Sequence, residues 1–236
     1  VGASDHVGEM VGVAGRGFDG VAVNHLAVTL VIEAEAAARI APFIRRTPVM
    51  TSASVDRAAG RRVWLKCENL QRVGAFKYRG ATNAVQKLDE GEARRGVVTH
   101  SSGNHAQALA LAARHRGIAC HVVMPTNAPS VKRVAVADFG ARIYDCEPTQ
   151  EARERTAAEV CERTGAVLIP PFDHPDVIAG QGTCGLEIFE EQPDLDAVIV
   201  PVGGVGLLSG ITLALREKAP SIRIIAAEPE GADDAF

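Results

Sequence analysis

Short apolar runs alternate with longer amphipathic stretches along most of the chain. The runs are rich in valine and isoleucine and predict strands at residues 63–66, 97–100, 119–124, 142–144, 166–169, 197–201 and 222–227. Helical patterns lie between them, as at residues 108–113 and 211–218. Strands separated by helices of this size predict an α/β fold with parallel sheets and right-handed crossovers.

Composition narrows the class of protein further. The chain has 236 residues, 47% of them hydrophobic, which is enough for a substantial core. A net charge of −4 without a long basic run gives no reason to expect a nucleic-acid partner. Residues 26–41 carry Glu33, Glu35 and Arg39, a pattern that favours an amphipathic helix over a membrane span. Five scattered cysteines suggest neither a disulfide framework nor a zinc site, so we expect a cytoplasmic protein.

One lysine stands out by its position. Lys77 follows Phe76 and precedes a helical pattern. A lysine that is desolvated in such a place loses its proton more readily, and only the neutral amine attacks an aldehyde. Lys77 is therefore a candidate Schiff-base former, and the alternative is an ordinary surface lysine at a helix start.

Two further segments join an apolar run to a helical pattern. Residues 101–105, Ser-Ser-Gly-Asn-His, follow the run at 97–99, and the free N–H groups of the helix start would suit a carboxylate or a phosphate. The alternative is a simple Ser/Asn N-cap. Residues 203–206, Gly-Gly-Val-Gly, follow the run at 197–200, and glycines let the backbone approach a phosphate closely. The alternative is a tight turn, and the spacing fits neither a dinucleotide fingerprint nor a Walker loop.

Together with residues 177–183 and 227–234, these segments resemble the serine/threonine dehydratase and serine racemase family of pyridoxal-phosphate enzymes. The resemblance runs from about residue 48 to residue 236 and implies the tryptophan synthase β-like fold, with two parallel-sheet, three-layer domains. It places a small domain, residues 92–172, inside a large domain made of residues 26–91 and 173–236. Residues 1–25 look like a loose N-terminal extension.

The resemblance also assigns roles to single residues. Lys77 would bind the cofactor and act as the catalytic base, Phe76 would wall the cofactor ring, and Asn104 would bind its 3-hydroxyl group. The main-chain N–H groups that would bind its phosphate belong to Gly203, Gly204, Val205, Gly206 and Leu207. The loop that would receive the substrate carboxylate contains Ser101, Ser102, Asn104 and His105.

One position departs from the family pattern. The family usually has a fourth glycine where this chain has Val205. Valine can still donate its N–H but resists a positive φ. Because the flanking glycines remain, we expect an ordinary backbone conformation at Val205.

A metal site is a further expectation. Carboxylates of Glu228 and Asp234 and the carbonyl of Ala232 would offer oxygen ligands to Mg²⁺ or Ca²⁺, as in metal-sensitive family members with a similar pattern. The alternative is an acidic surface turn.

The implied reaction is elimination of the β-hydroxyl from L-threonine or L-serine, which yields a 2-oxo acid and ammonia. Residues 171–176, Pro-Phe-Asp-His-Pro-Asp, look more like threonine dehydratases than serine racemases. Racemisation stays open, with Ser102 as the second acid/base, and so does an inactive fragment that only binds ligand. Family members continue past the equivalent of Phe236, so we expect a truncated copy of a protein that, at full length, is a homo-oligomer, a dimer or a tetramer.

Overall fold

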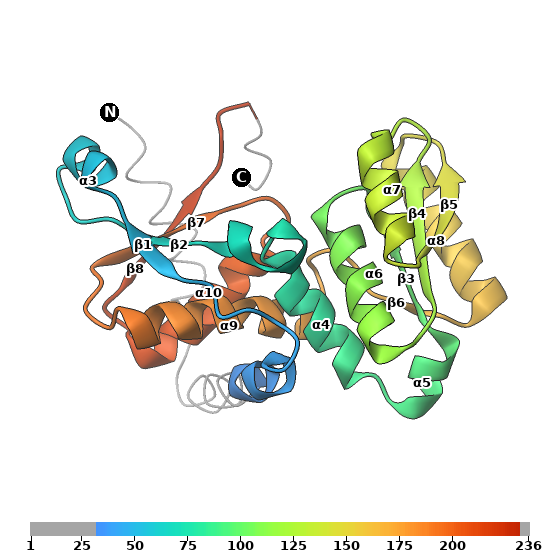
Figure 1. Ribbon diagram of the computed structural model, residues 1–236, viewed down its shortest axis with the longest axis horizontal. Coiled ribbons are helices and arrows are strands. Elements are labelled where there is room, and N and C mark those ends of the chain that lie inside the picture. Colours follow the sequence, from blue (N-terminus) through green and yellow to red (C-terminus); the bar gives the residue numbers. More distant parts are fainter. Residues whose placement is uncertain (1–31, 232–236) are drawn as a thin grey trace, which may run out of the picture.

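The computed structural model describes residues 32–231, and its secondary structure follows the predicted order (Figure 1). The strands are β1 Val49–Thr51, β2 Trp64–Lys66, β3 Val97–His100, β4 Cys120–Pro125, β5 Arg142–Cys146, β6 Val167–Leu168, β7 Ala197–Pro201 and β8 Arg223–Ala227. The helices are residues 32–40, α3 Ala53–Ala59, α4 Lys77–Lys87, α5 Glu90–Arg95, α6 Asn104–Arg116, α7 Ser130–Asp138, α8 Gln150–Thr164, α9 Pro175–Glu191 and α10 Gly206–Lys218, with short 3₁₀ turns η1 Glu68–Leu70 and η2 Arg72–Gly74. Every predicted run contains a strand, whereas β1 was not predicted and pairs antiparallel with β2.

A four-stranded parallel sheet forms one lobe of the molecule. Its strand order is β5-β4-β3-β6, and helices cover both faces (Figure 1). Val97 and Val122 pack with α6 and α7 on one face, and Val98 and Val123 pack with α8 on the other. Strands buried on both faces explain why these runs are continuously apolar. All four strands fall inside the predicted small domain, whose boundaries stay a prediction.

The order of these strands indicates where a ligand would bind. The chain leaves β3 through α6 to reach β4 on one side, and it returns from β5 through α8 to β6 on the other side of β3. Connections that leave in opposite directions from neighbouring strands open a space outside their carboxyl ends, where ligands of such sheets bind. Here that space lies beyond His100 and Leu168.

The other lobe is built around α9 and α10. The parallel pair β7-β8 packs its buried side chains, Val198 and Val200, against Ile211 and Leu215 of α10. The β1-β2 ribbon belongs to the same lobe (Figure 1). Within residues 32–231 no helix has the length and apolar character that crossing a membrane requires.

Helix α4 runs between the two lobes, where it packs on α6 and on α9 (Figure 1). Residues 78–85 of this helix are all buried. It crosses α9 at Gly80 and Gly180, where a β-carbon built on Gly180 would lie 2.6 Å from the Cα atom of Gly80. The backbones touch at this crossing, so only glycine fits there and the position of α4 is tightly fixed.

The guanidinium of Arg79 is the charged centre of this packing. Arg79 has no exposed surface, and its nitrogens donate to both carboxylate oxygens of Glu68, at 2.7 and 2.8 Å, and to both of Glu187, at 2.8 Å each. Lys66 also lies 2.8 Å from the Glu187 carboxylate. Burial lowers the pKa of Arg79, but the hydrogen bonds to Glu68 and Glu187 outweigh it and hold the pKa above its ordinary value. The cation thereby ties α4 to η1 and to α9.

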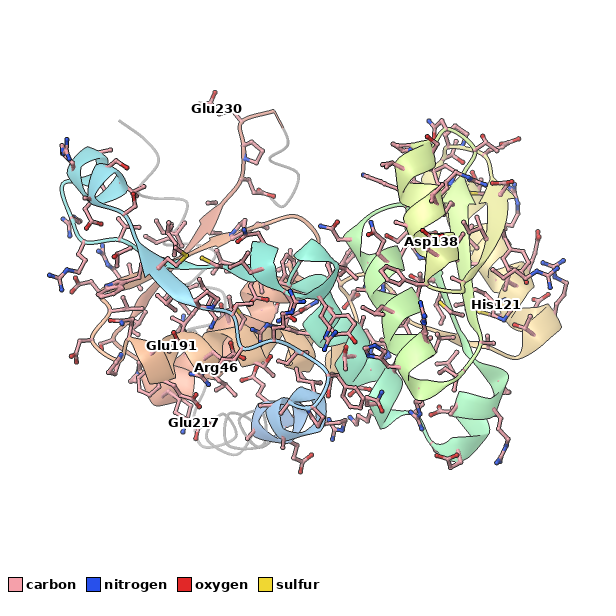
Figure 2. The ribbon with its side chains drawn as sticks, in the orientation of Figure 1. Arg46, His121, Asp138, Glu191, Glu217 and Glu230 are labelled. Atoms are coloured by element: carbon pink, nitrogen blue, oxygen red, sulfur yellow. The ribbon has the colours of Figure 1, made fainter. Side chains whose placement is uncertain are left out.

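We expect Arg79→Met to lower the free energy of unfolding by about 3 kcal/mol or more, because it leaves Glu68 without its cation and the buried Glu187 with Lys66 alone. The matched control is Arg46→Met. Arg46 lies beside Glu191 in Figure 2. Its side chain is 53% exposed and lies 2.8 Å from Glu190 and 3.4 Å from Glu191, so its loss should change stability by about 1 kcal/mol or less. Urea unfolding measures both variants. Equal losses for the two arginines would contradict the central role of Arg79.

Candidate active site

Lys77 begins helix α4 directly after Phe76, as the sequence predicted. Its Nζ atom donates a hydrogen bond of 2.5 Å to the carbonyl oxygen of Pro171. The same atom lies 5.4 Å from the ring centre of Phe76 and 6.0 Å from that of Phe172. Burial lowers the pKa of Lys77 to about 8. The amine therefore loses its proton far more readily than an ordinary lysine, which favours a nucleophilic role.

The turn at residues 101–104 lies at the carboxyl end of β3, directly after His100. The N–H of Ser101 donates to the carbonyl of Val123 at 3.2 Å, and the N–H of Gly103 donates to the Ser101 hydroxyl at 3.3 Å. Helix α6 starts at Asn104, whose side chain is exposed, and Ser102 is half-buried. The first N–H groups of a helix have no acceptor within the helix, so this turn offers donors to an anion.

His105, the last residue of the predicted carboxylate loop, turns its side chain into the core. The ring is 2% exposed, and its Nε2 atom lies 3.0 Å from the carbonyl oxygen of Ile169. Burial is the main reason that its pKa falls to about 3, so the ring is neutral. Its hydrogen bond links the start of α6 to the residue that follows β6.

The glycine loop leads from β7 into α10, which starts at Gly206. The N–H of Val205 donates to the carbonyl of Gly203 and that of Gly206 to the carbonyl of Gly204, both at 2.7 Å. Val205 has φ 61° and ψ −16°. The expectation of an ordinary conformation at Val205 was therefore wrong: the tight turn into α10 places its one left-handed residue at the valine. A β-branched residue in this region is strained.

The connection from β6 to α9, residues 169–174, joins these parts. The carbonyl of Ile169 binds His105, the carbonyl of Pro171 binds Lys77, and Phe172 packs against the glycine loop. Sequence reasoning did not name Pro171 or Phe172 as site residues. The available signal was that 166–169 is a predicted strand of the same sheet as 97–100, so the residues after both strands share one edge.

The predicted metal ligands are placed only in part. Glu228 follows β8, whereas Ala232 and Asp234 lie outside the described residues. Within residues 32–231 no group of three or more histidine, cysteine, aspartate or glutamate side chains is arranged to hold a metal ion. The metal site stays a prediction.

Comparison of the chain with known proteins identifies its family. The model of the pyridoxal-phosphate dependent enzyme family matches residues 40–236, and the chain belongs to that family. It is 49% identical over 221 residues to a serine racemase from Oryza sativa subsp. indica, covering 94% of this chain and 65% of the relative. It is 52% identical over 198 residues to a β-hydroxyaspartate dehydratase from Paracoccus denitrificans, covering 84% of this chain and 63% of the relative.

A solved structure agrees with the fold. The structure of maize serine racemase matches with a TM-score of 0.86 and 50% identity over 87% of this chain and 63% of that one. The chain thus spans less than two thirds of the length of each of these three relatives. The predicted α/β fold of the tryptophan synthase β type is confirmed.

The residues present fit pyridoxal phosphate on chemical grounds. Lys77 supplies an amine of lowered pKa beside two aromatic rings. The loop at residues 203–206 has a side chain only at Val205 and leads into the start of α10, where main-chain N–H groups and the helix dipole favour a phosphate. The individual roles of Phe76, Asn104 and Leu207 toward the cofactor stay predictions.

We expect Val205→Gly to raise the free energy of unfolding by roughly 0.5 to 1 kcal/mol. Relief of the left-handed conformation stabilises the folded state by about 1 to 2 kcal/mol. The greater conformational freedom of glycine in the unfolded chain lowers the stability by about 0.5 to 1 kcal/mol. The matched control is Val131→Gly in α7, where the valine is 74% exposed and helical, and there stability should fall by about 0.5 kcal/mol. Thermal and urea unfolding of the ligand-free protein measure both. A loss of stability at both valines would contradict strain at Val205.

Proposed function

We propose that this protein catalyses pyridoxal-phosphate-dependent β-elimination from a hydroxy amino acid, L-serine or L-threonine, to give a 2-oxo acid and ammonia. The position of Lys77 carries the proposal. Its amine has a pKa lowered to about 8 and donates to the connection 169–174, which also contacts the glycine loop through Phe172 and the start of α6 through Ile169. The β-hydroxyaspartate dehydratase relative supports the same reaction type and adds 3-hydroxyaspartate to the substrates worth testing.

Lys77 serves two purposes in this proposal. Its neutral amine would hold the cofactor covalently, and the same amine, when free, would take the proton from the substrate Cα. When bound, pyridoxal phosphate supplies the electron sink that stabilises negative charge at that carbon. Before either step the ammonium must give up its proton and its hydrogen bond to Pro171, which the lowered pKa makes easier.

The turn at residues 101–104 fixes the substrate. Its free N–H groups and the hydroxyls of Ser101 and Ser102 are donors for the substrate carboxylate. A carboxylate held there sets the direction of the Cα–H bond relative to Lys77, and such orientation accounts for a large part of the rate. His105 contributes by anchoring the turn to Ile169, since its neutral ring points into the core.

The direct test is covalent capture of added pyridoxal phosphate. The rate at which a borohydride-reducible adduct forms should rise with pH and level off above about 8, because only the neutral form of Lys77 reacts. Lys77→Ala and Lys77→Arg should both abolish the adduct, since a guanidinium stays protonated. The control Lys132→Ala removes an exposed lysine on α7 and should react like the parent. Absence of an adduct in the parent would favour an inactive fragment, and persistence in Lys77→Ala would favour another lysine such as Lys66.

Racemisation is the second candidate, and the 49% identity to a serine racemase favours it. Inversion needs a second acid/base on the opposite face of the substrate from Lys77. The half-buried hydroxyl of Ser102 lies in the turn that we propose for substrate binding, which makes it the candidate for that proton.

Ser102→Ala separates the two reactions. If Ser102 only helps to bind the carboxylate, its loss should cost about 1 kcal/mol, a several-fold effect on elimination and inversion alike. If it carries a proton, inversion should fall roughly 10²–10⁴-fold while elimination survives. The 2-oxo acid and the D-isomer are followed separately with L-serine, L-threonine and 3-hydroxyaspartate. Abundant D-serine from the parent that disappears in the variant would replace dehydratase by racemase as the main activity.

A further inference from the structure

Phe172 lies where Lys77 and the glycine loop meet, and no role in the proposed chemistry has yet been given to it. Its preceding carbonyl, that of Pro171, accepts from Lys77 at 2.5 Å, and its ring centre lies 6.0 Å from the Lys77 Nζ atom. Phe172 is 41% exposed, so its position is not explained by burial in a hydrophobic core. Its contacts must therefore explain why it sits there.

The closest of those contacts are with the glycine loop. A β-carbon built on Gly204 would overlap the ring of Phe172. A β-carbon on Gly206 would lie 3.0 Å from the Phe172 carbonyl oxygen and 3.2 Å from its Cα atom. A β-carbon on Gly203, by contrast, meets nothing within 4 Å. Phe172 thus occupies the side-chain space of two of the three glycines.

Backbone conformation does not explain these glycines. In residues 203–206 the positive φ belongs to Val205, and Gly204 and Gly206 do not adopt one. Glycine is needed at a position either for a left-handed backbone or for the close approach of another group. At Gly204 and Gly206 the second reason applies, and the approaching group is Phe172.

We propose that Phe172 is a positioning residue of the cofactor site: by packing on Gly204 and Gly206 it sets the phosphate-binding loop in place relative to Lys77. The proposal rests on the proposed function, because it assumes that this loop binds the cofactor phosphate. The loop is then held in position before the phosphate arrives, and that reduces the ordering that binding must impose. The strained turn at Val205, which lies between the two packed glycines, is held in the same way.

A double-mutant cycle tests the contact between Phe172 and Gly204. Phe172→Ala and Gly204→Ala should each weaken the binding of pyridoxal phosphate by about tenfold, because either change separates the ring from the loop. The double variant should bind no more weakly than the worse single variant. The matched control cycle combines Gly203→Ala with Phe172→Ala, and there the two effects should multiply, since no contact joins the two residues. Equilibrium dialysis measures the affinities.

The melting temperature of the ligand-free protein is the second readout. The losses in melting temperature from Phe172→Ala and Gly204→Ala should not add, whereas those from Phe172→Ala and Gly203→Ala should add. This holds whether or not the protein binds the cofactor. Independent effects of Phe172→Ala and Gly204→Ala would overturn the role of Phe172. Such effects would multiply in the affinity or add in the melting temperature. Failure of the parent to bind pyridoxal phosphate would instead reject the proposed function and leave the melting data to decide this contact. If Gly204→Ala does not fold, a folded double variant supports the proposal and an unfolded one overturns it.

Discussion

The pairing of Arg79 with Glu68 and Glu187 is the interaction on which the site depends most. A guanidinium without any exposed surface is tolerable only if its donors are satisfied, and two carboxylates on separate elements satisfy them with geometry that a single ion pair could not provide. Arg79 lies two residues beyond Lys77 on the same helix. Whatever fixes the rotation of α4 about its axis therefore also fixes the direction in which Lys77 points.

A second constraint comes from the order of strands in the parallel sheet. Because β3 has β4 on one side and β6 on the other, the segments that follow β3 and β6 emerge at one edge, although 64 residues separate His105 from Ile169. The turn at residues 101–104 and the connection 169–174 are neighbours for this reason alone. The sheet thus presents the proposed carboxylate site next to the carbonyl that holds Lys77.

Local pattern was enough to predict much of this. Continuous apolar runs marked the strands of the buried sheet. Phe76 followed by a helical pattern made Lys77 one candidate among the lysines, and the resemblance to a family was needed to single it out. Four features were out of reach of the local pattern. β1 is three residues long and is defined by pairing with β2. The positive φ of Val205 is set by the turn into α10, and the place of Phe172 requires β6 and α10 to be positioned first. The inward side chain of His105 likewise follows from the position of Ile169.

Two features of the site destabilise the folded state. Lys77 is desolvated so far that its pKa falls to about 8, and Val205 adopts a conformation that β-branched residues avoid. Neither arrangement would persist on a flexible loop, since each relaxes as soon as its surroundings move. Both persist because the elements on either side are fixed by stronger contacts: α4 by Arg79 and the Gly80–Gly180 crossing, and the start of α10 by its packing on Phe172. Rigid packing of the scaffold is therefore what allows an amine of lowered pKa and a strained loop to persist on either side of the segment that contains Pro171 and Phe172.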